Sequence, residues 1–284
     1  MADFPSPYWY LEQNDTSGTG IALRLVNKIV EKQSPFQKVE VYQTTDFGYL
    51  MVIDGSTMLS SLDSFFYHEM MVHPALFSHP NPHKVLIIGG GNCGILQQVL
   101  KHPEVDSVTQ VDLDNLVTEM SLKYFPELCK NTQDPRVQLI FADGIDYLQQ
   151  IEANSFDIIM IDSTGAGRDC EELFSPTFYQ SCFSALNEQG IVVQQSGSPL
   201  LNQSLIKTIR TNMQQVGFNQ TETLLFPQPI YPSGYWSCTM ATKAADYRQF
   251  RDADAAKMSQ QLEYYNLAIH KLSCTLPNFL AKHI

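Results

Sequence analysis

The sequence has 284 residues, which is enough for one large domain or for a large and a small one. Hydrophobic residues make up 44% and charged residues 17%, so the composition supports a well-buried core and argues against a disordered tail or a coiled coil. The formal net charge of −12 argues against a nucleic-acid partner, because phosphate binding needs a basic face. The same charge suits either solubility alone or a cationic substrate.

The sequence carries no signal for a membrane or for export. No run approaches the roughly 18 apolar residues of a membrane span. The first residues lack the basic and apolar regions of a signal peptide. The six cysteines form no CxxC pair and no spacing typical of a disulfide framework. We therefore expect a cytoplasmic protein that does not meet a membrane.

The first part of the chain predicts a small antiparallel β unit. Residues 39–43 alternate between apolar and polar types, as a half-buried strand does, and 47–53 form a second apolar run. Asp54-Gly55 is a strong hairpin signal, and 58–60 would return as a third strand. We expect residues 1–63 to form an N-terminal β domain.

The rest of the chain predicts a doubly wound α/β domain over 64–284. A helix over about 64–77 comes first, and Pro80-Asn81-Pro82 ends it. Strands and helices then alternate, and the strands are continuously apolar, which is typical of a parallel sheet covered on both faces. The predicted strands are 85–88, 108–111, 137–141, 156–161 and 191–193, and the predicted helices are 95–100, 116–124 and 205–215.

A glycine-rich loop marks a cofactor site at the start of this domain. Gly89-Gly90-Gly91-Asn92-Cys93-Gly94 fits the pattern G-x-G-x-x-G and lies between a predicted strand and a predicted helix. Asp112 ends the next strand, about twenty residues on, where an acid can bind a ribose hydroxyl pair. Together they predict a site for an adenosine-containing cofactor. The candidate binding residues of the loop are Gly89, Gly91, Asn92 and Gly94.

Two more acids decide which cofactor is expected. Asp143, followed by Gly144, comes after the third predicted strand, and Asp162 ends the fourth. The carboxyl ends of parallel strands form the ligand-bearing edge of an open sheet. Acids at three such ends can bind a ribose and an adenine amine and favour a positive charge, so we expect an adenosyl-sulfonium cofactor. A nicotinamide-dependent oxidoreductase becomes the distant alternative.

Several motifs follow one another along nearly the whole chain. They are Asp54-Gly55 with Asp63-Ser64-Phe65-Phe66-Tyr67-His68-Glu69-Met70, the run from His79 to Gly91, Leu173-Phe174-Ser175-Pro176-Thr177-Phe178-Tyr179, Ile230-Tyr231-Pro232-Ser233-Gly234, and Tyr264-Tyr265-Asn266-Leu267-Ala268-Ile269-His270. In content and order they resemble the spermidine synthase family, the polyamine aminopropyltransferases. The resemblance implies a Rossmann-like, class I methyltransferase-like fold with a small β domain in front.

The resemblance also implies a reaction. An aminopropyl group would pass from decarboxylated S-adenosylmethionine to putrescine or a related amine, without a metal. A free alkylamine has a pKa near ~10 and arrives protonated, so a nearby carboxylate must accept its proton. By position, the residues that would bind the adenosine part are Gln37, Asp112, Asp143 and Gly144. Those that would line the amine pocket are Tyr67, His68 and Tyr231. The family implies a homodimer or homotetramer, with the β domain serving assembly and the substrate entrance.

Three positions depart from the family's motifs. The family's loop reads G-G-G-D-G, with an Asp that pairs with the ammonium of the decarboxylated cofactor, and Asn92 stands there. The motif D-S-[ST]-D-P places the proton-accepting Asp at the position of Gly165, which we expect in the substrate site. The Gln of D-G-x-x-Q is Met58. We therefore expect Asp162, with Asp169 as a surrogate on the same loop, to supply the catalytic carboxylates.

These departures leave three functions open. The leading interpretation is a spermidine synthase-like aminopropyltransferase with altered or lost activity. Asn92 removes the repulsion that an Asp would exert on the carboxylate of S-adenosylmethionine, so an amine N-methyltransferase that uses S-adenosylmethionine is the second. Gly165 has no side chain to accept a proton, so a non-catalytic nucleoside- or polyamine-binding relative is the third. The fold alone does not decide among them.

Overall fold

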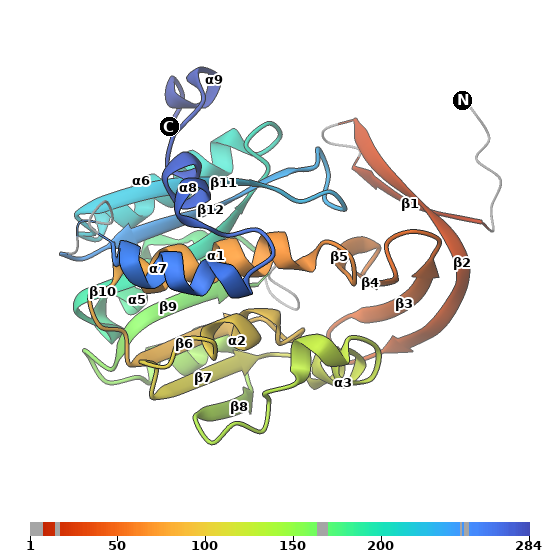
Figure 1. The fold of residues 1–284 in the computed structure, drawn as a ribbon, viewed down its shortest axis with the longest axis horizontal. Helices are drawn as coiled ribbons and strands as arrows, with labels where there is room; N and C mark the ends of the chain where they lie inside the picture. The colour runs from red at the N-terminus through yellow and green to blue at the C-terminus, as the bar shows by residue number, and fades with distance from the viewer. Residues whose placement is uncertain (1–7, 15–17, 164–169, 245, 247–249) are drawn as a thin grey trace.

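Two sheets organise the chain (Figure 1). The structure is a computed structural model that describes residues 8–14, 18–163, 170–244, 246 and 250–284. Within these residues a five-stranded antiparallel sheet precedes a seven-stranded sheet that is covered by helices. This arrangement confirms the predicted Rossmann-like α/β fold behind a small β unit. The division of the chain into domains at 63/64 stays a prediction.

The first sheet is a meander in sequence order. Its strands are β1 Trp9–Asn14, β2 Thr19–Gln33, β3 Lys38–Thr44, β4 Tyr49–Ile53 and β5 Ser56–Ser60. The last three overlap the predicted strands, and Asp54 and Gly55 form the tight turn with φ of 48° and 80°. The first two strands escape the sequence patterns because most of their residues are exposed or half-buried, which leaves no clear alternation.

The second sheet is mixed rather than wholly parallel. Its order is β11-β12-β10-β9-β6-β7-β8. Five parallel strands carry the predicted runs: β6 Lys84–Gly89, β7 Ser107–Asp112, β8 Val137–Phe141, β9 Phe156–Asp162 and β10 Leu186–Gly197. Two unpredicted antiparallel strands extend the sheet beyond β10: β11 Gln220–Pro227 and β12 Tyr235–Thr242. They form a hairpin, which needs no crossover helix and so lacks the strand–helix alternation that marked the others.

Helices cover both faces of this sheet. The three predicted along it are α2 Gly94–Val99, α3 Asn115–Tyr124 and α6 Gln203–Gln215, and the predicted helix before it is α1 Ser64–Ser78. The others are α4 Gly144–Gln149, α5 Pro176–Ala185, α7 Asp252–Met258, α8 Leu267–Ser273 and α9 Asn278–Ala281, with short 3-10 turns at Pro126–Cys129, Cys170–Phe174 and Ser259–Gln261. Across the described residues, no helix is both long and apolar enough to cross a membrane.

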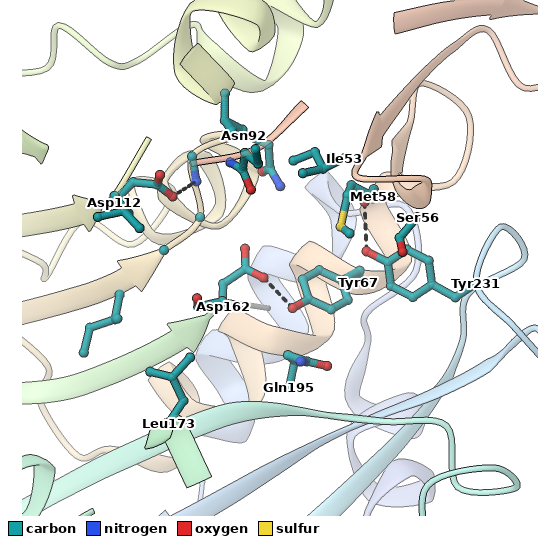
Figure 2. Close-up of a pocket in the computed structure, with 18 of the residues that line it drawn as sticks. Ile53, Ser56, Met58, Tyr67, Asn92, Asp112, Asp162, Leu173, Gln195 and Tyr231 are labelled. Carbon is teal, nitrogen blue, oxygen red and sulfur yellow. Dashed lines mark hydrogen bonds between the residues drawn. The ribbon is translucent and has the colours of Figure 1, made fainter. Parts of the chain in front are cut away.

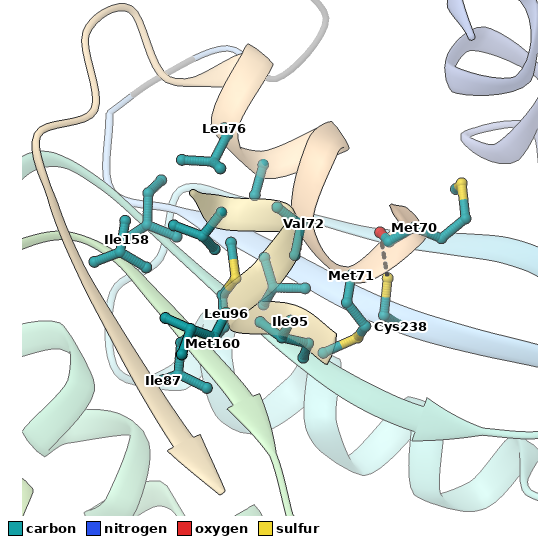
Figure 3. Packing of buried hydrophobic residues seen from close by; sticks show 14 of the residues in the cluster. Met70, Met71, Val72, Leu76, Ile87, Ile95, Leu96, Ile158, Met160 and Cys238 are labelled. Atoms are coloured by element: carbon teal, nitrogen blue, oxygen red, sulfur yellow. Dashed lines mark hydrogen bonds between the residues drawn. The ribbon is translucent and has the colours of Figure 1, made fainter. Parts of the chain in front are cut away.

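The continuous apolar strands are explained by two cores, one on each face. In β6, Val85 and Ile87 enter the core beneath α1 and α2, and Leu86 and Ile88 enter the core beneath α4, α5 and α6. Successive strand side chains point to opposite faces, so a strand buried on both faces must be apolar at every position. Figure 3 shows the first core, where side chains of α1 and α2 pack on β6 and β9.

The strand order reverses between β6 and β9, and this reversal positions the site. From β6 the chain proceeds outward to β7 and β8, and from β9 it proceeds to β10 on the other side. Gly89 at the end of β6 pairs directly with Asp162 at the end of β9. Ligands of open α/β sheets bind beyond the carboxyl ends of the strands at such a point.

The N-terminal sheet packs over this same edge. Its apolar face rests on α3, where Val41 and Met51 meet Val117 and Met120. A second contact joins the sheet to the turn after β11, through Ile230. The first sheet therefore stands opposite the carboxyl ends of the parallel strands (Figure 1).

Candidate active site

A cavity of about 670 Å³ lies between the two sheets (Figure 2). Its size falls within the range typical of small-molecule sites, about 300 to 1,000 Å³. Most of the predicted site residues border it: Gln37, Tyr67, Gly89, Gly91, Asn92, Asp112, Asp143, Gly144, Asp162 and Tyr231. Residues from both sheets, from α1 and from the turn after β11 thus share one site.

The glycine loop is shaped by the ends of β7 and β9. Gly89 has a φ of 82°, and a Cβ there would lie 2.1 Å from the carbonyl oxygen of Asp162, so glycine is required. The backbone N–H of Gly90 donates to the same oxygen at 2.9 Å. The backbone N–H of Gly91 donates to Oδ2 of Asp112 at 2.9 Å. The loop is therefore held against the two strand-end acids.

Asp112 and Asp143 are both held by backbone groups. The second oxygen of Asp112 accepts from the N–H of Asp114 at 2.8 Å, and burial raises the pKa of Asp112 to about 6 against these hydrogen bonds. Asp143 caps α4, because its Oδ1 accepts from the N–H of Ile145 at 2.8 Å. Both carboxylates consequently keep defined positions on the cavity wall.

Asp162 faces the cavity from the end of β9. Its Oδ1 accepts a hydrogen bond of 2.5 Å from the hydroxyl of Tyr67 on α1 (Figure 2). Its Oδ2 is buried and has no hydrogen-bond partner among the described residues. Burial raises the pKa of Asp162 to about 6; the bond from Tyr67 opposes this shift, and the charge of Asp112 adds to it.

An aromatic wall stands beside Asp162. The rings of Tyr67 and Tyr231 meet edge to face with centroids 6.0 Å apart, and Tyr231 meets Trp236 in the same way at 4.7 Å. The hydroxyl of Tyr231 donates to the backbone oxygen of Met58 at 2.8 Å. Burial, then the charge of Asp162, raises the pKa of both tyrosines well above 10, so they stay neutral. Such rings can stabilise a cation.

Two further polar atoms border the cavity without a partner in the described chain, Oε1 of Gln195 and Nε1 of Trp236. A buried polar atom left without a hydrogen bond costs about 1 to 3 kcal/mol. Oδ2 of Asp162 and Oε1 of Gln195 are acceptors, and Nε1 of Trp236 is a donor. The two acceptors suit a ligand that donates N–H groups, and the charge of Asp162 favours a positive one.

Glu12 is a site residue that the sequence patterns missed. It lies on β1, borders the cavity, and its Oε2 accepts from both the N–H and the hydroxyl of Thr57, each at 2.7 Å. No local signal marks it, because β1 is mostly exposed and contributes to the site only through the packing of one sheet on the other. The first sheet thus also contributes an acid to the cavity wall.

Two predicted residues lie behind the loop instead of on the cavity wall. The ring of His68 packs on Gly94 so closely that a Cβ at Gly94 would lie 2.0 Å from its Cε1. Neither residue borders the cavity, and burial lowers the pKa of His68 to about 4. Asn92 does border it, and its Oδ1 accepts from the N–H of Gly94 at 2.7 Å. Gly165 and Asp169 lie outside the described residues.

The fold and the cavity together define a Rossmann-like protein with an acidic, aromatic site at the switch point of its sheet. Residues 64–251 match the model of the spermine/spermidine synthase domain, and residues 8–61 match that of the spermidine synthase tetramerisation domain. The chain belongs to the spermidine synthase family. This result confirms the resemblance seen in the motifs.

Relatives agree over nearly the whole length. A protein of Xanthomonas campestris pv. campestris (strain B100), named polyamine aminopropyltransferase, is 52% identical over 275 residues, which is 96% of each chain. Among solved structures, a spermidine synthase in complex with the transition-state analogue AdoDATO superposes with a TM-score of 0.93 at 36% identity, over 98% of this chain and 95% of the other. Spermidine synthase from Thermotoga maritima gives 0.92 at 35%, over 98% and 94%.

Proposed function

We propose that this protein transfers an aminopropyl group from decarboxylated S-adenosylmethionine to putrescine or a related amine. The observation that carries the proposal is the buried Asp162 carboxylate at the cavity wall, which is held by Tyr67 on one oxygen and leaves the other without a hydrogen-bond partner among the described residues. Membership of the spermidine synthase family supports the same reaction.

The adenosine part is assigned to the side of the cavity that the seven-stranded sheet forms. Asp112 and Asp143 stand at successive strand ends, where a ribose and an adenine amine can be bound. Gln37 borders the cavity from the opposite sheet. Gly89 and Gly91 let a ligand approach the backbone of the loop closely. The acids on this side also favour the positive sulfonium.

The proton is assigned to Asp162. The incoming ammonium gives a proton to the carboxylate, and the freed amine nitrogen attacks the methylene carbon next to the sulfonium. As the carbon–nitrogen bond forms, the carbon–sulfur bond breaks, and methylthioadenosine leaves with the bonding electron pair. A carboxylate whose pKa is raised to about 6 accepts a proton more readily than an ordinary one and is still ionised at neutral pH. Asp169 and Gly165 keep their predicted roles of surrogate and substrate contact as proposals.

The rest of the amine is assigned to the aromatic wall and Glu12. Tyr67, Tyr231 and Trp236 offer ring faces and edges to the alkyl chain and the cation. Glu12 supplies a charge for a second ammonium. His68, which lies behind the loop, supports the wall by packing rather than by contact with the amine.

Asn92 favours a second candidate, the S-adenosylmethionine-dependent amine N-methyltransferase. Its side chain borders the cavity and carries no negative charge, although it is also hydrogen-bonded to the backbone of Gly94 and to His68. An N–H donor suits the carboxylate of S-adenosylmethionine better than the ammonium that both forms of the cofactor carry. The aminopropyl reading remains the conclusion because the whole chain matches that family.

Calorimetric titration separates the two candidates. We expect tighter binding of the decarboxylated cofactor than of S-adenosylmethionine, together with release of methylthioadenosine when putrescine is added. Asp162→Asn should lower kcat by about 10²- to 10⁴-fold, the usual contribution of a general base. The matched control is Asp106→Asn, an exposed acid that does not border the cavity. Tighter binding of S-adenosylmethionine with methyl transfer would replace the proposal by the second candidate.

A further inference from the structure

The fifth residue of the glycine loop has a strained backbone. Cys93 has a φ of 64° and a ψ of 6°, in the left-handed region, at the point where α2 begins. A residue other than glycine pays about 1 to 2 kcal/mol there. The motif G-G-G-D-G has glycine at this position, so the cysteine is not needed for the turn.

A second cysteine lies against the same loop. Cys129, at the end of the 3-10 turn that follows α3, directs its Sγ to the backbone oxygen of Asn92 at 3.8 Å. The Sγ of Cys93 lies 3.7 Å from the backbone oxygen of Gly91. The two thiols thus use neighbouring carbonyl groups and belong to the same buried cluster.

The two thiols also interact directly. A hydrogen bond from Cys129 lowers the pKa of Cys93, and the same contact raises the pKa of Cys129. The side-chain amide of Gln110 adds a long contact of 4.0 Å to the Sγ of Cys93. Ionisation of one thiol is therefore tied to the other, and a thiolate is the form that reacts with oxidants.

The pair is almost fully buried. Cys93 has no exposed surface and Cys129 keeps 5% of its own, but the turn that carries Cys129 also carries the exposed Glu127. The other side of the loop, at Gly91 and Asn92, borders the cavity. The small exposed part of Cys129 is therefore the point at which a small oxidant can reach the pair.

We propose that Cys93 and Cys129 form a reversible disulfide that distorts the glycine loop and switches off binding in the cavity. The oxidant is a hydroperoxide. The thiolate of one cysteine attacks the peroxide, which leaves a sulfenic acid on that cysteine and releases hydroxide. The thiol of the other cysteine then attacks that sulfur and water leaves, so two thiols and one hydrogen peroxide give one disulfide and two waters.

The consequence for the site follows from the length of the new bond. A disulfide holds its sulfur atoms at about 2.05 Å, shorter than any contact between thiols. The two sulfur atoms must then approach each other, and we expect the loop to take up part of this movement because Cys93 is bonded to Asn92 and Gly94 on either side. Both thiol contacts to the loop carbonyls are lost as well. This step rests on the proposed binding of an adenosine ligand at the loop, whereas the disulfide itself does not.

The first test maps the disulfide. The full-length protein is treated with hydrogen peroxide, its free thiols are blocked, and its peptides are analysed by mass spectrometry without reduction. We expect a peptide pair that joins Cys93 to Cys129, which disappears after treatment with dithiothreitol and in the Cys129→Ala variant. Cys274→Ala is the matched control, because Cys274 is only half-buried and far from the loop in the sequence. Oxidation of Cys274 without the 93–129 pair would overturn the proposal.

The second test measures binding of methylthioadenosine before and after oxidation. We expect the Kd to rise by about tenfold or more in the oxidised protein and to return after reduction. Cys129→Ala should bind like the wild type and ignore peroxide. An unchanged Kd with the bridge present would refute the switch. Absence of binding in the reduced wild type would instead contradict the proposed function, and the peptide map would still decide whether the disulfide forms.

Discussion

Asp162 carries a cost for stability that the proposed chemistry explains. Its pKa is raised from 3.8 to about 6, so the folded protein binds a proton more tightly than the unfolded chain. Stability from this group is present in full below pH ~4 and is lost as the pH rises through about 6. Above that, the buried charge destabilises the fold by about 2 to 3 kcal/mol, at 1.36 kcal/mol per pKa unit.

We therefore expect Asp162→Asn to raise the free energy of unfolding by about 2 kcal/mol at pH 8 while it removes activity. The gain should shrink toward pH 4, where the wild-type carboxyl is protonated too. Urea denaturation at several pH values measures it. Asp106→Asn, at the exposed surface, serves as the control. A variant less stable than the wild type at pH 8 would show that the charge of Asp162 does not destabilise the fold.

The hydroxyl of Tyr67 affects the pKa of the Asp162 carboxyl. The hydrogen bond from Tyr67 lowers the pKa of Asp162, against the larger effect of burial. If Asp162 accepts the proton, kcat/KM should fall as the pH drops below about 6. In Tyr67→Phe this acid limb should move to higher pH. A pH profile of both proteins decides the matter, and a limb at the same pH in each would argue against Asp162 as the acceptor.

The sequence predicted most residues of the cavity wall but not which of them contact one another. Asp112, Asp143 and Asp162 could be found because strand ends are marked by local patterns. The pairing of Tyr67 with Asp162 could not, because the two residues are 95 positions apart and meet only when α1 packs on the sheet. For the same reason Glu12 has no signal of its own.

At the scale of elements, the packing of α1 against α2 requires a residue without a Cβ at one position. Gly94 opens α2 directly against the ring of His68 on α1. Gly94 packs on His68 and does not border the cavity, and its role in contacting the cofactor stays a prediction. Two helices that approach this closely need glycine at the point of contact, just as a tight turn needs glycine for its backbone conformation.

We expect Gly94→Ala to destabilise the protein by about 1 to 3 kcal/mol, the usual cost of overpacking. Replacement of His68 by Ala in the same chain should recover part of that loss, because the added methyl group then has space. Thermal unfolding of the two single variants and the double variant forms the cycle. Strictly additive losses would mean that the two residues do not interact in this way.

The hairpin of β11 and β12 shows where pattern reading fails at this scale. The strands β6 to β10 are separated by helical segments, and that alternation is visible in the sequence. The hairpin extends the sheet through antiparallel pairing with β10 alone. It matters for the site because the turn between its strands carries Tyr231, and Trp236 follows at the start of β12.

At the scale of the whole molecule, the N-terminal sheet is also a candidate surface for assembly. Residues 8–61 match a tetramerisation domain, and β1 and β2 expose the apolar side chains of Leu11 and Val26. We propose that this sheet joins copies of the chain into a homodimer or homotetramer.

We expect Val26→Asp to shift the protein to a smaller species in sedimentation, because a charge at an apolar interface is costly to bury. Leu272→Asp is the control, since Leu272 is an exposed apolar residue on α8, away from the first sheet. If Val26→Asp keeps the mass of the wild type, the interface does not include this residue.

The sequence by itself determined the fold class, the glycine loop and the acids at the strand ends. These features follow from periodicity, from glycine and from the order of elements, all of which are local. Only the tertiary structure decided that His68 lies behind the loop, that Glu12 joins the cavity from the other sheet, and that one oxygen of Asp162 stays without a partner in the described chain. The reason is that contacts between distant segments depend on how layers pack, which no short stretch of residues records.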